Sequence, residues 1–148
     1  MSKDINLAKT LNEFRQATME MDNVYSMFSK SCGLTEAEYW SLLLISDGVD
    51  TQSKISEKLF VSRQTLNSAF KQHIKKGFVQ LVPIEGNQRS KQAVLTDSGR
   101  AFVNKYILNM RRSEENAWRS MHVKEREALT ALTKKFSSLI IEELGSLK

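Results

Sequence analysis

Residues 55–77 have the sequence ISEKLFVSRQTLNSAFKQHIKKG, which predicts two short helices joined by a tight turn. Ile55, Leu59 and Val61 give the first helix and the turn an apolar anchor. Ser62 follows, and its side-chain oxygen can cap the free backbone N–H groups at the start of a second helix. We therefore expect a helix-turn-helix at the centre of the chain.

The second helix of this pair, Arg63–Lys75, has one apolar and one polar face. Residues at spacings of three and four predict a stripe that faces a core: Leu66, Ala69, Phe70, His73 and Ile74. The opposite face carries long or amide-bearing side chains: Arg63, Gln64, Asn67, Ser68, Lys71 and Lys75. Because such groups can pair with base edges, we expect this reader helix to lie in the major groove of double-stranded DNA.

The formal net charge of +5 is concentrated around the same helix. Between Ser62 and Gln92 there are six cations and one anion, so this window carries the whole excess. A basic patch on a helix favours nucleic acid over a membrane surface as the partner. A solvated basic face with no partner is the alternative.

Length and composition set the broad class. The chain has 148 residues, of which 41% are hydrophobic, enough for one domain with its own core. It has no apolar run long enough for a spanning helix or a secretory leader, which predicts a soluble, cytoplasmic protein without a membrane partner. A single cysteine excludes an internal disulfide and fits a reducing compartment.

The segment before the reader helix predicts three helices. Residues 5–30 carry a heptad-like seam at alternating steps of three and four: Leu7, Leu11, Phe14, Thr18, Met21, Tyr25 and Phe28. Gly33 is expected to end that helix, and 35–38 (TEAE) forms a capping box for the next one. Thr51 is expected to cap a third helix, Gln52–Phe60.

After Gly77 the pattern changes from helical to extended. Residues 78–82 and 92–95 predict two strands on either side of a polar, turn-rich tip, 83–91. Such a hairpin beside a helix-turn-helix is a wing. Arg89 and Lys91 at its tip suit an adjacent minor groove, where the negative potential favours arginine.

Two further helices complete the chain. Residues 96–98 (TDS) are expected to cap a helix that continues to Met121, and a last helix carries apolar residues from Leu129 to Leu147. Packing the end helices on a second copy across a two-fold axis would bury their apolar faces. The predicted fold is mainly α with a small antiparallel β-hairpin. It is a single domain, with a winged helix-turn-helix over 34–99 flanked by dimerisation helices at 1–33 and 100–148.

In this order of elements the chain resembles the MarR family of winged-helix transcriptional regulators over nearly its whole length. The resemblance lies in LTEAEYWSLLLI at 34–45, TQSKISEKLFVSRQTLNSAFKQHIKKGFV at 51–79 and RSKQAVLTDSGR at 89–100. The wing residues that match the family spacing are Pro83, Asn87, Arg89, Leu95, Thr96 and Gly99. Asn87 stands where the family prefers aspartate, and His73 where it is usually aliphatic.

The resemblance implies a homodimeric, sequence-specific regulator, more often a repressor than an activator, on a palindromic DNA operator. It also implies that a small-molecule effector or another signal releases the DNA. No cofactor is expected. A nonspecific architectural DNA-binding protein is the alternative, although Gln64, Asn67 and Ser68 are groups that discriminate bases. The expected DNA-binding residues are Thr51, Gln52, Ser62, Arg63, Gln64, Thr65, Asn67, Ser68, Lys71, Lys75, Asn87, Gln88, Arg89 and Lys91.

Other chemistry finds little support in the sequence. One cysteine and two distant histidines do not make a zinc site, and no nucleophile or paired-carboxylate arrangement predicts an enzyme. His122, with Glu125 three residues on, is interpreted as a helix cap or a solvent-exposed residue. Cys32 lies at the C-terminal end of a helix, where the dipole disfavours a thiolate, so a structural cysteine is favoured over a redox sensor.

Overall fold

A computed structural model describes residues 2–147, with the side chains of 5–87 and 89–147. The chain forms two compact units, one ending at Asn109 and the other beginning at Met110. Each is described by itself.

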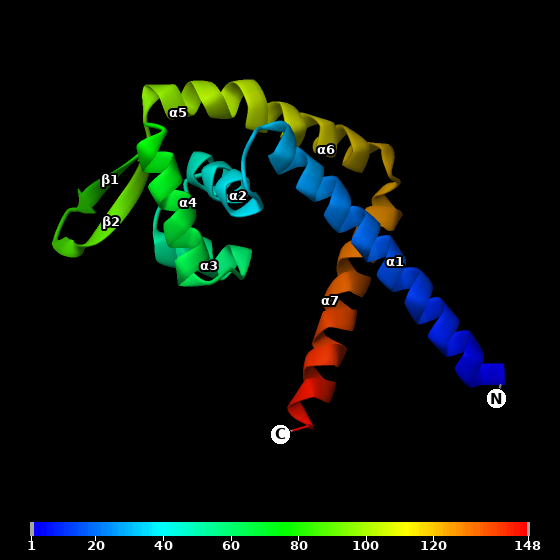
Figure 1. Ribbon diagram of the computed structural model, residues 1–148. Helices are drawn as coiled ribbons and strands as arrows, with labels where there is room; N and C mark the ends of the chain where they lie inside the picture. The colour runs from blue at the N-terminus through cyan, green and yellow to red at the C-terminus, as the bar shows by residue number, and fades with distance from the viewer. Residues whose placement is uncertain (1, 148) are drawn as a thin grey trace. The chain divides into compact units, whose positions relative to one another are not determined.

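The first unit contains the helices α1 (Ser2–Ser31), α2 (Glu36–Ser46), α3 (Gln52–Leu59) and α4 (Arg63–Lys75), followed by a hairpin of β1 (Val79–Ile84) and β2 (Asn87–Leu95) (Figure 1). Next come α5 (Asp97–Phe102) and a π-helical turn, η1 (Val103–Ile107). α6 (Leu108–Ser120) continues into the second unit, which also holds α7 (Val123–Gly145). This is the predicted fold class: mainly helical, with a winged helix-turn-helix formed by α3, α4 and the hairpin.

The predicted helix starts are confirmed by their capping hydrogen bonds. Thr35 Oγ1 accepts from the Glu38 backbone N, and Glu38 Oε2 accepts from the Thr35 N, both at 3.2 Å. Thr96 Oγ1 accepts from the Gly99 N at 3.0 Å. In the second unit, His122 Nδ1 accepts from the Lys124 N at 3.2 Å and Glu125 Oε2 from the His122 N at 2.8 Å, so His122 is a helix cap.

The core of the first unit lies where α2 packs against α4 and η1. Its most buried apolar side chains come from five elements: Tyr39, Leu42, Ile55, Leu66, Ala69, Phe70, Val79, Val103 and Ile107. The stripe predicted on the reader helix therefore faces the core, with one correction. Ile74 is 47% exposed. At about 100° per residue it lies about 80° around the helix from Leu66, at the margin of the stripe and one residue before the helix ends.

His73 is fully buried, with its Nε2 2.8 Å from Ser41 Oγ. The Ser41 hydroxyl also lies 3.1 Å from the Glu38 carbonyl, an acceptor for its one proton, which favours the tautomer in which Nε2 donates to Ser41. Nδ1 has no hydrogen-bond partner among the described residues. Burial, and then the nearby charge of Lys76, lowers the pKa of His73 to about 4, so the ring is neutral at pH 7.

The hairpin is longer than predicted. Val79 pairs with Leu95, and the pairing continues in register to Pro83 opposite Lys91. The register then shifts, and Ile84 pairs with Asn87. Only Glu85 and Gly86 form the turn, and Gly86 has φ of 84°. The prediction of a loop over 83–91 is therefore wrong. A two-stranded wing is exposed to water on much of its surface, so polar residues can form strand there without apolar alternation.

Phe60, in the turn between α3 and α4, has a left-handed backbone conformation. Its φ is 54°, and its side chain is 94% exposed. Among the described residues Phe60 is the one non-glycine with positive φ, so α3 ends at Leu59, one residue earlier than predicted.

In the second unit, one face of α7 carries apolar side chains that stay exposed. Six residues of α7, and Leu147 just after its end, are 38–81% exposed: Leu129, Leu132, Phe136, Leu139, Ile140, Leu144 and Leu147. The C-terminal part of this face has a shallow hollow of about 300 Å³, lined mainly by apolar side chains.

Candidate nucleic-acid interface

The outer face of α4 is exposed along its length. Residues Arg63, Gln64, Thr65, Asn67, Ser68, Lys71 and Lys75 are all exposed, as predicted. At about 100° per residue, four of them lie on the side opposite buried Leu66: Gln64, Ser68, Lys71 and Lys75. The apolar stripe thus holds α4 against the first unit while a row of amide, hydroxyl and ammonium groups faces outward.

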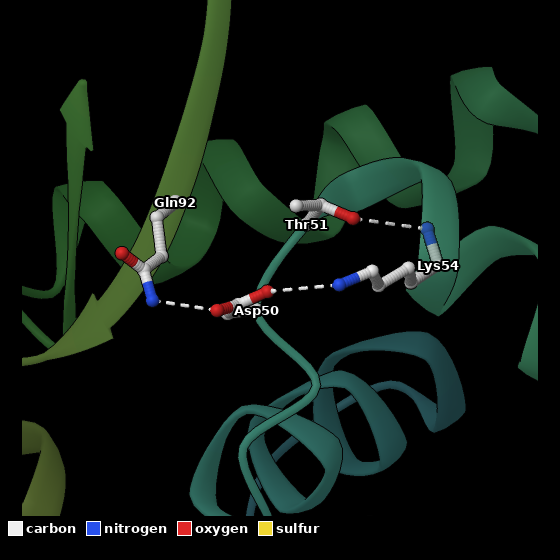
Figure 2. Close-up of polar contacts among 4 residues, drawn as sticks. All are labelled: Asp50, Thr51, Lys54 and Gln92. Carbon is white, nitrogen blue, oxygen red and sulfur yellow. Dashed lines mark hydrogen bonds and ion pairs between the residues drawn. The ribbon is translucent and has the colours of Figure 1, made fainter. Parts of the chain in front are cut away.

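The hydroxyl groups in this region shape the backbone. Ser62 Oγ accepts from the Thr65 N at 3.1 Å and lies 2.9 Å from Thr65 Oγ1. Thr51 Oγ1 accepts from the Lys54 N at 3.2 Å, which caps α3 (Figure 2). Ser68 Oγ donates to the Gln64 carbonyl at 3.1 Å. Thr51 and Ser62 thus fix the starts of α3 and α4, and any contact they make with a ligand comes in addition to that role.

Two amide side chains join the start of α3 to α4. Gln52 Nε2 donates to Asn67 Oδ1 at 3.2 Å, from the first residue of α3 to the middle of α4. This contact orients Asn67 so that its Nδ2 group and the second lone pair of Oδ1 remain available.

The wing presents the other predicted residues. Asn87, Arg89 and Lys91 are exposed on β2, and the side chain of Gln88 lies outside the described residues. Asn87 Oδ1 accepts from the Arg89 backbone N at 3.2 Å, and Asn87 Nδ2 donates to Ser90 Oγ at 3.1 Å. Asn87 thus braces Arg89 through its main chain, which needs no charge on the side chain at 87.

The predicted cations are available to a polyanion. Within the described part of the chain, Arg63, Lys71, Lys75, Arg89 and Lys91 form no ion pair. Unpaired cations on α4 and the wing, together with the amide groups of α4, can neutralise phosphates and present hydrogen-bonding groups to base edges.

A contact at the base of the wing was not predicted. Asp50, in the loop between α2 and α3, lies between Gln92 of β2 and Lys54 of α3 (Figure 2). Asp50 and Gln92 are 42 residues apart, and a pairing at that separation leaves no periodic signal in a single sequence.

Cys32 is partly buried, and burial raises the pKa of its thiol, opposed by a contact with Ser31 Oγ at 3.9 Å. A raised pKa lowers the thiolate fraction at neutral pH, which favours the structural interpretation of this cysteine. Among the described residues, no three His, Cys, Asp or Glu side chains are grouped as metal ligands. No helix within 2–147 is both long and apolar enough to cross a membrane.

No protein-family model matches the sequence. A search of curated proteins finds the uncharacterized HTH-type transcriptional regulator YybA of Bacillus subtilis, 27% identical over 123 residues, which cover 82% of each chain. The match therefore covers most of both chains.

Among solved structures, the fold is similar to NMB1585, a MarR family regulator from Neisseria meningitidis. The TM-score is 0.80 at 17% identity, covering 94% of this chain and 99% of that one. It is also similar to BpsR of Bordetella bronchiseptica, whose DNA binding is regulated by 6-hydroxynicotinic acid. That TM-score is 0.67 at 16% identity, covering 85% and 91%. At these identities the matches show the fold, which is that of the MarR regulators.

Proposed function

We propose that this chain, with the fold of the MarR regulators, is a dimeric, sequence-specific DNA-binding regulator of transcription rather than an enzyme. The outer face of α4 would read bases in the major groove, and Arg89 and Lys91 on the wing would contact the adjacent minor groove or its phosphates. Acting on chromosomal DNA, it would work in the cytoplasm.

The observation that carries the proposal is the division of α4 into two faces. Leu66, Ala69 and Phe70 are at most 3% exposed, whereas the predicted contact residues on the other face are exposed. Gln64 and Asn67 can hydrogen-bond base edges, while Lys71 and Lys75 neutralise phosphates. An architectural protein would need only the second kind of group.

Dimer formation is supported by the apolar faces of the end helices. On α1, the seam residues Leu7, Phe14 and Met21 are 44–68% exposed, and α7 carries the exposed apolar face described above. Such faces cost free energy in water, and a second copy would bury them. In a dimer, two copies of α4 would enter major grooves one helical turn apart, which fits a palindromic operator.

Release of the DNA by a small molecule completes the proposal. Its support is the likeness to BpsR, whose DNA binding is regulated by 6-hydroxynicotinic acid. A regulator of this kind would act as a repressor whose affinity for DNA falls when the effector binds.

Selection of binding sites from a library of random DNA duplexes tests the proposal. The wild-type protein should enrich one motif with two-fold symmetry and half-sites centred about 10 base pairs apart. Tight binding without an enriched motif would instead support the architectural alternative. Absence of binding at low salt would contradict both.

A further inference from the structure

We propose that Asp50 is a positioning residue that fastens the base of the wing to the start of α3, so that the wing and α4 meet DNA in a fixed relation. The inference rests on the proposed function, because it explains how two DNA-contacting elements are held together. It concerns Asp50 and Gln92, neither of which is among the expected contact residues.

Asp50 makes three contacts at this joint, and Figure 2 shows the two made by its side chain, with Gln92 and Lys54. Asp50 Oδ2 accepts from Gln92 Nε2 at 2.5 Å, and Asp50 Oδ1 lies 3.7 Å from Lys54 Nζ. The Asp50 carbonyl accepts from the Ala93 backbone N at 2.6 Å. Asp50 therefore holds two consecutive residues of β2 and reaches the first turn of α3.

The bond to Gln92 is the stronger of the two side-chain contacts. Its acceptor is a carboxylate and it is partly buried, and both features strengthen a hydrogen bond relative to one between neutral groups in water. The Lys54 side chain is 65% exposed, and an ion pair in that setting contributes little. Loss of the Asp50 carboxylate should therefore affect the placement of the wing more than that of α3.

A small rotation of the wing about this joint would displace the residues farther along β2. Lys91 is one residue and Arg89 three residues from Gln92 along β2, so Arg89 lies about 10 Å away at the usual rise of a strand. A tilt of about 15° at the base would move Arg89 by about 2.5 Å, well beyond the roughly 0.5 Å within which a binding geometry must be held.

If Asp50 acted only through its charge, its removal would change DNA affinity in the opposite direction from the change that a positioning role predicts. Asp50 is an anion close to a basic face, so its removal should strengthen binding to a polyanion if it acts only through its field. If it positions the wing, its removal should weaken binding to the selected DNA despite the gain in positive charge. The two effects therefore differ in sign.

The test uses the full-length protein, the duplex that the wild type selects, and a shuffled duplex of the same length. Binding is measured by fluorescence anisotropy for Asp50→Ala, Gln92→Ala and the double variant. Glu57→Ala is the matched control, since it removes the same charge from an exposed position on α3.

We expect Asp50→Ala and Gln92→Ala each to weaken binding to the selected duplex about fivefold to tenfold, and the double variant to lose no more than either single one. Glu57→Ala should bind as well as the wild type or better. Arg89→Ala should cost much less affinity in the Asp50→Ala background than in the wild type, a coupling that general loss of stability would not produce.

Asp50→Asn guards against misfolding, because it keeps an oxygen acceptor for Gln92 and removes only the charge. It should lose about twofold to threefold, less than Asp50→Ala. The positioning role is overturned if Asp50→Ala binds like Glu57→Ala, or if the Asp50 and Gln92 effects add. If the wild type does not distinguish the selected from the shuffled duplex, the proposed function fails, and the positioning role fails with it.

Discussion

At the scale of single residues, His73 makes stability depend on pH. Its pKa is about 4 in the folded protein, against about 6.5 in the unfolded chain, so between these values the unfolded state binds the extra proton. The stability that His73 contributes should be nearly complete at pH 7 and should fall as the pH drops towards 4, by about 2 kcal/mol at pH 5.

Urea unfolding of the wild type and of His73→Leu at pH 7 and pH 5 measures this effect. The variant should be less stable at pH 7, because Ser41 loses its partner, but its additional loss at pH 5 should be smaller by about the same 2 kcal/mol. An equal loss in both proteins would show that other groups account for the acid sensitivity.

Packing around position 99 requires a residue without a side chain, and Gly99 meets this requirement. A Cβ built at this position would overlap the carbonyl oxygen of Phe78, where the first turn of α5 meets the base of β1. We expect Gly99→Ala to destabilise the protein by about 2 kcal/mol or more, because a main-chain atom has to move.

Thermal unfolding followed by circular dichroism checks this prediction. Gly145→Ala is the control, since a Cβ there meets nothing within 4 Å and alanine favours helix. The packing argument is wrong if the two variants unfold at the same temperature.

At the scale of elements, the proposed function assigns contacts with both bases and phosphates to α4 and the wing. Lys71 is exposed on the side of α4 opposite the core, where it can neutralise one phosphate. Lys71→Ala should weaken binding to every duplex and reduce the slope of log K against log salt by about one. Titrations at four salt concentrations measure that slope, with Lys135→Ala on α7 as the control. An unchanged slope would exclude Lys71 as a phosphate contact.

Elements whose signals are local were predictable from the sequence. Thr35, Ser62, Thr96 and His122 each cap a helix through bonds to residues within three positions, and the sequence contains that information. Polar strands carry no apolar alternation, so the outer half of the wing was predicted as a loop.

Features that depend on distant residues were not predictable. The contact of Asp50 with Gln92 joins residues far apart in the chain, and the exposure of Ile74 depends on where the packing around α4 stops. Of the candidate site, the reader helix and the basic wing followed from the sequence, whereas the joint between the wing and the start of α3 required the structure.

At the scale of the whole molecule, the exposed apolar faces predict a dimer. The wild type should have twice the 16.9 kDa mass of one chain in sedimentation equilibrium at micromolar concentration. Leu139→Asp, on the apolar face of α7, should shift the protein towards monomer and weaken binding to a two-site duplex, because it would bury an unpaired charge at the interface. Ser137→Asp, at an exposed position on the same helix, should not. A wild-type mass of one chain would contradict the dimer.

The most direct test of base reading by α4 is to repeat the selection from random duplexes with Asn67→Ala beside the wild type and Lys135→Ala. Asn67 lies on the exposed side of α4 with its amide oriented by Gln52, so its loss should remove the preference for one base at the same position of both half-sites. We expect the rest of the motif to be retained, with a cost of about 1–3 kcal/mol on the original best duplex. A motif that is identical for all three proteins, with only a uniform change in affinity, would contradict the claim that α4 reads the bases.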